Sequence, residues 1–276
     1  MSIEAEAPEN LSENFAKKLV TSIGQRVLGA AYVLGGIGIL LRYVYRDLGR
    51  KPLHFYLMVE QLYHIGAKSL SLVLITAMST GMVMALQFGF GLAKFGGKLY
   101  VPKLVALSMV REMAPVFCSL MLAARVGAGI ASEIGSMKVT QQIDAIRALG
   151  TSPIKRIVIP RIIACLIAAP LLVALGNAFG ILGSLAVEVW ELGLDPMFCL
   201  EKMFTTVQVK DYLTGIGKTF FFAFFISVTS CYFGMNVRGG TQGVGTATTR
   251  AVVVSSVMIL IGDFFLTKAF FFLFER

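Results

Sequence analysis

Apolar stretches of membrane-spanning length alternate with short polar segments along most of this chain. A helix crosses the hydrocarbon core of a bilayer with about 20 apolar residues. Several stretches reach that length with few charged residues, and they lie at positions 69–93, 103–130, 154–187, 212–237 and 251–274. The pattern therefore predicts an all-α integral membrane protein with five transmembrane helices.

The N-terminal part of the chain departs from this pattern. The uncharged stretch Val27–Leu41 is shorter than a bilayer requires and contains four glycines. We interpret residues 15–55 as an interfacial or re-entrant helix with its connector. Residues 1–14 contain four glutamates and no apolar periodicity, so they are predicted to form a disordered tail. The transmembrane domain then covers residues 56–276.

The composition supports a membrane protein, because 56% of the residues are hydrophobic and only 15% are charged. The net charge of +9 would suit a nucleic-acid-binding protein, but no basic cluster has the interleaved aromatic residues that stack on bases. We therefore expect no nucleic acid among the partners. Acidic residues gather between the third and fourth stretches, where Pro196–Thr205 is predicted to form a short helix.

The distribution of basic residues predicts the orientation. Loops on the cytoplasmic side of membrane proteins carry an excess of lysine and arginine. Basic residues surround the segment after the second stretch and flank the segment after the fourth, namely Lys138, Arg147, Lys155, Arg156, Arg161, Arg238 and Arg250. We therefore expect a cytoplasmic N-terminus and a C-terminus on the opposite side, although Lys94, Lys98 and Lys103 on the predicted outer loop count against this.

A short polar segment, Glu133–Pro153, separates the second and third stretches. Its apolar residues recur with helical spacing at Val139, Ile143, Ile146 and Leu149, and polar residues lie between them, namely Gln141, Gln142, Asp144 and Arg147. Gly150 and Pro153 are expected to end the helix. A helix this short is marginal alone in water, so its apolar stripe should rest on the membrane surface or on another protein.

The sequence contains no phosphate-binding loop of the G-x-x-x-x-G-K-[ST] type. The glycine-rich segment Gly239–Thr246 lacks the lysine, and we predict a flexible cytoplasmic turn there. The cysteines and histidines are scattered, so no metal site, cofactor or catalytic residue is expected. A membrane bundle without an energy-converting motif suggests that energy arrives from a docked partner, as it does through the coupling helix of an ATP-binding-cassette permease.

Charged residues within the apolar stretches are expensive in hydrocarbon unless they are paired or hydrated. Among them are Arg111, Glu112, Lys218, Asp263 and Lys268, and each of these should face the bundle or a cavity. Arg111 and Glu112 are adjacent on one helix and cannot satisfy each other well, so each needs a partner elsewhere. The residues leave three roles open: a structural ion pair, a cavity for a charged amphiphile, and a proton relay.

Several long motifs resemble the MlaE/YrbE family of lipid-transport permeases, and the resemblance covers roughly residues 20–274. The motifs are EQLYHIGAKSL (60–70), LVALSMVREMAP (104–115), AARVGAGIASEIGSMKVTQQIDAIRALGTSP (123–153), GTATTRAVVVSS (245–256) and GDFFLT (262–267). The resemblance implies a homodimeric permease of the bacterial inner membrane with a periplasmic C-terminus. It also implies a cytoplasmic ATPase pair, a STAS-domain protein, a periplasmic hexamer of MCE-domain chains and a phospholipid substrate, with outer-membrane lipid asymmetry as the outcome.

The resemblance also assigns roles to residues by position. The residues implied to line a lipid cavity are Arg111, Glu112, Lys218, Asp263, Leu86, Gln87, Phe88 and Phe90. The residues implied to dock or couple to the ATPase are Glu133, Val139, Gln142, Ile143, Asp144, Ile146, Arg147 and Leu149. The alternatives are a secondary transporter that uses Glu112 and Asp263 as a proton relay, and a non-transporting anchor for a periplasmic ring. The direction of lipid movement and the headgroup preference are not fixed by the sequence.

Overall fold

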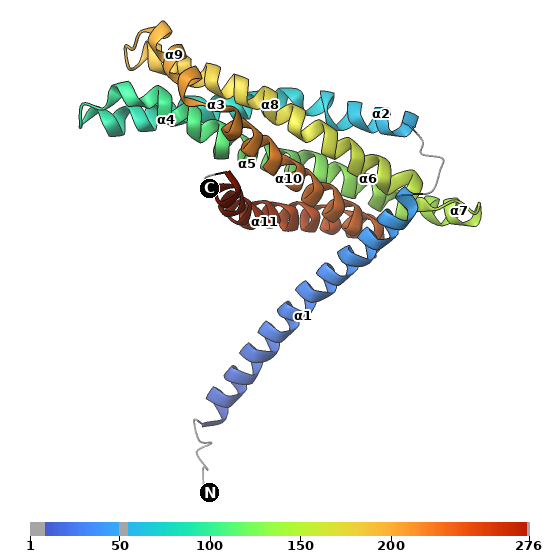
Figure 1. The fold of residues 1–276 in the computed structure, drawn as a ribbon. Coiled ribbons are helices and arrows are strands. Elements are labelled where there is room, and N and C mark those ends of the chain that lie inside the picture. The colour runs from blue at the N-terminus through green and yellow to red at the C-terminus, as the bar shows by residue number, and fades with distance from the viewer. Residues whose placement is uncertain (1–8, 50–54, 275–276) are drawn as a thin grey trace, which may run out of the picture.

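The computed structural model describes residues 9–49 and 55–274, and the regular structure in this part of the chain is entirely helical (Figure 1). The prediction of an all-α membrane protein is confirmed. The α-helices in chain order are α1 (Glu9–Leu48), α2 (Phe55–Ile65), α3 (Leu70–Ala93), α4 (Val101–Ser108), α5 (Ala114–Leu122), α6 (Ala128–Val139), α7 (Gln142–Ala148), α8 (Ile159–Trp190), α9 (Pro196–Thr206), α10 (Val209–Met235) and α11 (Gly240–Phe274).

Single helical turns of other kinds join several of these helices. The 3₁₀ turns are η1 (Ala67–Ser69) and η2 (Lys98–Tyr100), and the π-helical turns are η3 (Met109–Met113), η4 (Ala123–Gly127) and η5 (Ile154–Val158). The π turns keep α4, α5 and α6 in one continuous run. That run extends from Lys98 to Val139, which is longer at both ends than the predicted stretch 103–130.

Six helical stretches of the described residues are long and apolar enough to cross a membrane. Five of them overlap the predicted transmembrane stretches over nearly their whole length, and the sixth is Val27–Leu48 at the N-terminal side. The helices α3, α8 and α10 pack at the centre, with α2, the run from α4 to α6, and α11 around them (Figure 1).

The close packing of α3 on α8 depends on small residues at the crossing. Gly81 of α3 is fully buried, and a β-carbon at this position would overlap the carbonyl oxygen of Gly180 of α8. A β-carbon on Gly183 would similarly press on the backbone of Met78. Small residues let helix backbones approach closely where lipid gives no hydrophobic driving force between helices. Gly176 and Gly180 form a GxxxG pattern in the sequence. This pattern is frequent in membrane helices, and here it lies at a helix crossing.

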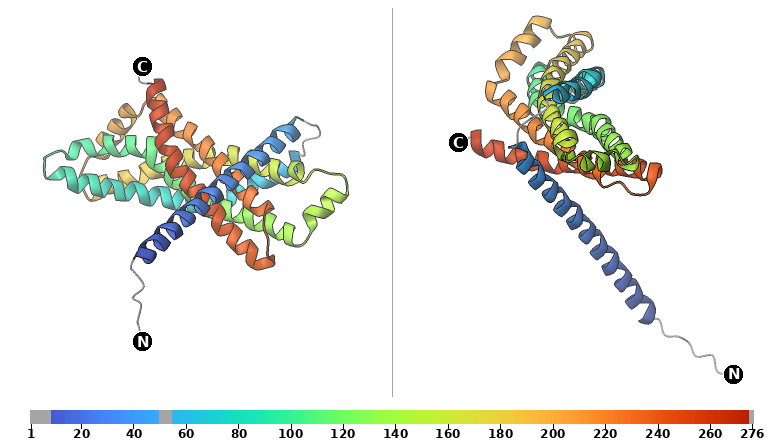
Figure 2. Two further views of the ribbon diagram at one scale, coloured as in Figure 1. Left: turned by 90° about the horizontal axis from the view of Figure 1, so that it is seen from below. Right: turned by 90° about the vertical axis from the view of Figure 1, so that its right-hand side faces the viewer.

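The N-terminal helix differs from its prediction. α1 is one continuous helix of 40 residues, so the break expected of a re-entrant segment is absent from the described range 9–48. It leaves the bundle at an angle, as two perpendicular views show (Figure 2). Residues 1–8 of the predicted tail lie outside the described residues, whereas 9–14 are helical, which corrects that boundary. The interfacial placement of α1 stays a prediction.

Two further segments are more helical than expected. α2 (Phe55–Ile65) continues through η1 into α3, so the first membrane helix is extended back to Phe55. The predicted flexible turn at Gly239–Thr246 is wrong, because α11 already begins at Gly240. Glycine disfavours a helix by about 1 kcal/mol per residue relative to alanine, and the packing of Val244 against α6 beside Gly135 offsets part of that preference. The short helix α9 occurs where it was predicted, with the Asp195 side chain accepting a hydrogen bond from the backbone N–H of Phe198 (2.9 Å).

The connections gather at the two ends of the bundle. One end holds α7, the turn around Val237 and the C-terminal end of α1, where the Ser152 hydroxyl donates to the Asp47 carboxylate (2.6 Å). The other end holds α9 and the connection from α3 to α4, and there Leu192 lies against Gly89 (Figure 1). We refer to these as the α7 end and the α9 end.

Candidate functional site

Lys218 lies inside the bundle as a fully buried cation. Its side chain is 0% exposed, and its Nζ donates to the Glu112 carboxylate at 2.6 Å and to the Asp263 carboxylate at 3.1 Å. The Nζ also donates to the Thr267 hydroxyl (2.6 Å) and to the backbone carbonyl of Arg111 (3.3 Å). Groups from the η3 turn, α10 and α11 thus meet at one ammonium, which joins three membrane helices.

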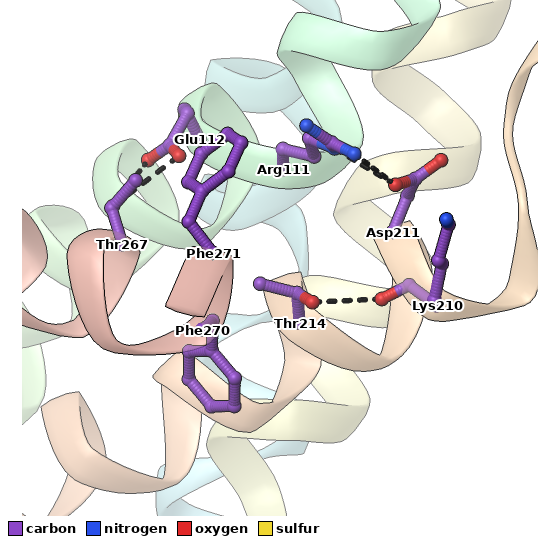
Figure 3. A pocket seen from close by; sticks show the side chains of 8 residues that line it. All are labelled: Arg111, Glu112, Lys210, Asp211, Thr214, Thr267, Phe270 and Phe271. Carbon is purple, nitrogen blue, oxygen red and sulfur yellow. Dashed lines mark hydrogen bonds and ion pairs between the residues drawn. The ribbon is translucent and has the colours of Figure 1, made fainter. Parts of the chain in front are cut away.

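Arg111 finds its partner in Asp211, at the start of α10. Both the Nε and the Nη2 of Arg111 donate to the same carboxylate oxygen, at 2.8 and 2.6 Å (Figure 3). Asp211 is almost completely buried and also accepts the backbone N–H of Gln208 (2.9 Å), forming a capping box at the start of α10. Adjacent Arg111 and Glu112 therefore pair in different directions, as the sequence required.

The π-helical turn η3 explains how two adjacent charges reach two separate partners. A π turn widens the helix by one residue and is frequent at functional sites. In η3 it holds Met109 and Val110 in the core, while Arg111 and Glu112 are partly exposed. Arg111 also lies over the ring of Phe271 of α11, with its Cζ 5.3 Å from the ring centre, which is a cation–π geometry.

A small cavity opens beside these charges (Figure 3). Its volume is about 30 Å³, and its walls combine charged residues with aromatic ones: Arg111, Glu112, Lys210, Asp211, Thr214, Thr267, Phe270 and Phe271. A space of this size holds water rather than a larger molecule. The chemistry of the walls nevertheless suits an amphiphile, because a guanidinium and two phenyl rings share one opening.

The structure brings together four of the residues predicted to line a cavity, Arg111, Glu112, Lys218 and Asp263. Arg111 and Glu112 line the small cavity, whereas Lys218 and Asp263 belong to the ion-pair cluster and are not among its lining residues. The other four predicted residues, Leu86, Gln87, Phe88 and Phe90, do not line it either. They lie on α3, where Leu86 and Phe88 pack against the core and Phe90 is 64% exposed. Lys268 is exposed on α11 rather than turned toward the bundle, which corrects that expectation for the single chain. Asp211 was not among the predicted residues, because Asp211 lies just before the apolar stretch that begins at Tyr212.

The predicted coupling helix is shorter than expected. Gln141 has a positive φ of 59°, which separates Val139, the last residue of α6, from α7. The predicted apolar stripe is also divided: Ile143 is fully buried and Ile146 packs on the core, whereas Leu149 is 80% exposed. The polar residues Gln142, Asp144 and Arg147 are exposed, and Asp144 pairs with Arg147 (3.3 Å) and Lys138 (3.1 Å). α7 is therefore anchored by its own chain and presents a mixed surface.

Glu133, the remaining residue of the predicted docking set, lies on α6. Its carboxylate pairs with the guanidinium of Arg161 on α8 at 2.9 Å. Arg161 is only 4% exposed and also donates to the backbone carbonyl of Ile157 (2.8 Å). The pair ties α6 to α8 near the α7 end, so Glu133 has a structural contact whatever else it does.

The chain is similar to known proteins over most of its length. The family model described as Permease MlaE matches residues 58–269. A probable ABC transporter permease protein of Rickettsia bellii is 40% identical over 92% of this chain and 98% of its own length. The intermembrane phospholipid transport system permease protein MlaE of Haemophilus influenzae is 34% identical over 91% of this chain and 97% of its own length.

A chloroplast protein is also similar to this chain. The protein TRIGALACTOSYLDIACYLGLYCEROL 1 of Arabidopsis thaliana is 34% identical over 79% of this chain and 63% of its own length. The family match begins in α2 and ends in α11, so it contains the whole charged cluster and α7 but leaves out α1. The chain belongs to the MlaE permease family.

Proposed function

We propose that this chain is the membrane permease subunit of an ATP-driven phospholipid transporter and that a separate ATPase supplies the energy. The observation that carries the proposal is the charged cluster inside an apolar bundle, with Lys218 buried between two carboxylates beside the partly exposed Arg111. The family membership and the similarity to the phospholipid transport permease of Haemophilus influenzae support the same conclusion.

The cavity beside Arg111 provides the chemistry for a phospholipid headgroup. A guanidinium presents a planar fork of donors that matches phosphate oxygens, and the rings of Phe270 and Phe271 offer apolar contact to the start of an acyl chain. The single chain leaves only about 30 Å³ there. We therefore place the lipid at an interface, where a second copy against the exposed apolar face of α11 would complete the walls.

The exposed face of α11 supports a homodimer. Large apolar side chains cover this face, namely Val253, Val257, Leu260, Ile261, Phe264, Phe265 and Phe272. The same helix supplies Asp263 and Thr267 to the charged cluster. A dimer formed through α11 would thus bring two clusters close to one shared lipid cavity.

The remaining assignments concern partners and orientation. The α7 end, with the exposed Leu149 and the basic residues around it, would face the cytoplasm and receive the ATPase, with a STAS-domain protein as a further cytoplasmic partner. The α9 end would face the periplasm and a hexamer of MCE-domain chains. In this arrangement the N-terminus is cytoplasmic, the C-terminus is periplasmic, and transport maintains lipid asymmetry in the outer membrane.

A double substitution tests the role of Arg111 without leaving a buried carboxylate unpaired. Arg111→Gln combined with Asp211→Asn removes both charges of the ion pair together. We expect phospholipid transfer by the reconstituted complex to fall roughly tenfold or more, as loss of a charged hydrogen bond predicts. The matched control is Lys103→Gln, which removes an exposed charge from the same helical run. Unchanged transfer in a correctly assembled double variant would contradict the assignment.

One observation keeps a second function in view. Lys218 shares its proton donors between Glu112 and Asp263, and two carboxylates on one ammonium form an arrangement that also suits a proton relay. A proton-coupled transporter would move substrate without an ATPase and would respond to a proton gradient. A non-transporting anchor would tolerate replacement of the cluster by apolar residues without loss of function.

A further inference from the structure

A polar groove runs along α2, between α6 and α8, far from the charged cluster. It consists of two adjoining cavities of about 230 and 160 Å³ that share Gln61 and Glu133. The first cavity lies at the α7 end, where Gln142 and Ile146 form part of its wall. The second continues toward Ser69 at the start of α3. Together they fall within the roughly 300–1,000 Å³ typical of small-molecule sites.

The walls of the groove contain buried donors that have no partner. Arg161 is 4% exposed and lines the first cavity, and its Nε makes no hydrogen bond among the described residues. Ser69 is 1% exposed and lines the second cavity, and its hydroxyl is likewise unpartnered in this part of the chain. Buried polar groups in native proteins nearly always have a partner, so these donors point to a ligand or to water that a ligand holds.

The charge balance of the groove favours an anion. Three arginines line it, and Arg161 is neutralised by its ion pair with Glu133. Arg125 and Arg156 are exposed and form no ion pair within the described ranges. Glu60 is the one further carboxylate among the lining residues, so the positive charges of the groove exceed its negative charges. Arg125 lies in a helical run that is long and apolar enough to cross a membrane, and a guanidinium without a partner is costly wherever the bilayer removes it from water. An anion that enters from the bilayer would relieve that cost.

Arg125 and Arg156, like Arg111, lie in π-helical turns. The three π-helical turns in the described chain contain Arg111, Arg125 and Arg156 respectively. The turn at Arg125 is followed by Ala128, where α6 begins, and the turn at Arg156 leads into α8. Since π turns are uncommon and cluster at functional sites, their coincidence with both unpaired arginines of the groove is a separate sign of a binding role.

We infer that the groove binds the phosphate of a phospholipid from the leaflet on the α7 side, with Arg125 and Arg156 as the phosphate ligands. Apolar residues beside the polar ones would contact the glycerol and the first acyl carbons, namely Leu57, Met137, Ile146 and Ile157. The site is distinct from the cavity at Arg111, which lies toward the α9 end. Naming that leaflet as cytoplasmic rests on the proposed function, whereas the phosphate chemistry does not.

The test counts bound lipids on the purified full-length chain in detergent by native mass spectrometry. The chain is titrated with phosphatidylglycerol, with diacylglycerol carrying the same acyl chains, and with glycerol phosphate, which has no acyl chains. The variant is Arg125→Gln with Arg156→Gln. The control is Arg238→Gln with Arg250→Gln, which also removes two exposed arginines and leaves the groove intact. Melting temperatures establish that each variant is folded.

We expect the groove variant to bind one phosphatidylglycerol roughly tenfold more weakly for each arginine removed, since each loses a charge-assisted hydrogen bond. Arg125→Lys should restore part of the affinity, and diacylglycerol should not bind at this site. Equal binding by the variant and the control would overturn the proposal. Binding of glycerol phosphate as tight as that of the lipid would instead identify a site for a free anion.

Two comparisons distinguish lipid binding in the groove from the role of Arg111 in phospholipid transfer. Arg111→Gln with Asp211→Asn should leave the groove lipid in place even when transfer is lost, so failure at one site does not predict failure at the other. If the groove variant loses the ATPase on purification while its lipid count stays unchanged, the groove holds a protein segment. That result would contradict a lipid site.

Discussion

The Lys218 side chain lies inside the bundle, is fully buried from solvent, and is stabilised by two carboxylates and a hydroxyl. A buried charge persists in a protein when its pairing and hydrogen bonds offset the cost of desolvation. At the scale of single residues, this ammonium holds α10 to α11 and to the helical run that contains Glu112. It therefore contributes to stability as well as to the chemistry of the cavity.

Removal of the Lys218 charge tests how much this residue contributes to stability. Lys218→Met leaves Glu112 and Asp263 without their common partner, and we expect a loss of about 2–3 kcal/mol of stability, below the range for fully buried pairs because both carboxylates are partly exposed. Thermal unfolding in detergent measures it. Lys268→Met, at an exposed position on α11, should change stability by about 0.5 kcal/mol or less. Adding Glu112→Gln and Asp263→Asn to Lys218→Met should restore much of the loss, and an unrestored variant would argue against the pairing.

Cys199 on α9 gives a prediction about pH. Burial, with the nearby carboxylates of Glu188 and Asp195, raises the pKa of the Cys199 thiol to about 12 from its ordinary value of 9. The folded state therefore resists ionisation that the unfolded chain undergoes. Stability from this group is fully present below pH 9 and is lost as the pH rises from 9 toward 12.

Comparison of the native chain with Cys199→Ser measures this effect, since the serine variant should lose less stability between pH 8 and about pH 10. The thiol should also resist maleimide at neutral pH until the chain is denatured. Rapid labelling of Cys199 in the folded chain would contradict its burial.

At the scale of elements, the close contact of α3 with α8 depends on glycine. Gly81→Ala would place a β-carbon into the backbone of Gly180, and the two helices would have to separate. Overpacking of this kind costs about 1–3 kcal/mol, which thermal unfolding would show as a lower midpoint. Gly91→Ala on the same helix meets no atom within 4 Å and should have little effect or a small stabilising one. Equal effects of the two substitutions would show that the contact is not tight.

Different residues of the α7 region are expected to anchor it to the bundle and to contact the proposed ATPase. Ile143→Ala should loosen α7 by about 2–5 kcal/mol of local packing because this side chain is fully buried. Leu149→Ala should leave stability unchanged, since Leu149 is 80% exposed, yet it should weaken capture of the ATPase. Amide hydrogen exchange in α7 and co-purification of the ATPase measure the two effects. Unaltered capture by Leu149→Ala would remove this residue from the docking surface.

The elements also show which features a sequence can predict. The apolar stretches and α9 were predictable because length and composition determine them locally. Local spacing also required separate partners for Arg111 and Glu112, but it could not name Asp211, which depends on how α10 packs. The division of the α7 stripe depends on the left-handed backbone of Gln141, and glutamine gives no signal for that conformation. The helical Gly240–Thr246 segment likewise depends on tertiary contact with α6.

At the scale of the whole molecule, the two ends of the bundle have different roles in this account. The charged cluster lies nearer the α9 end, while α7, the polar groove along α2 and the exposed Arg156 lie toward the α7 end. α1 contacts the bundle mainly near its C-terminal end and extends away from it (Figure 2). Coupling between the ends would pass through the continuous helices α8, α10 and α11, which connect both. The family match covers these helices and both ends.

The energy source distinguishes an ATP-driven permease from a proton-coupled transporter. The chain is reconstituted together with the proposed ATPase in vesicles that contain a headgroup-labelled phospholipid, and movement of the label is followed after ATP is added without any ion gradient. We predict lipid movement that requires ATP hydrolysis and falls roughly tenfold or more when Arg111→Gln is combined with Asp211→Asn. Movement driven by a proton gradient in the absence of ATP and the ATPase would contradict this prediction.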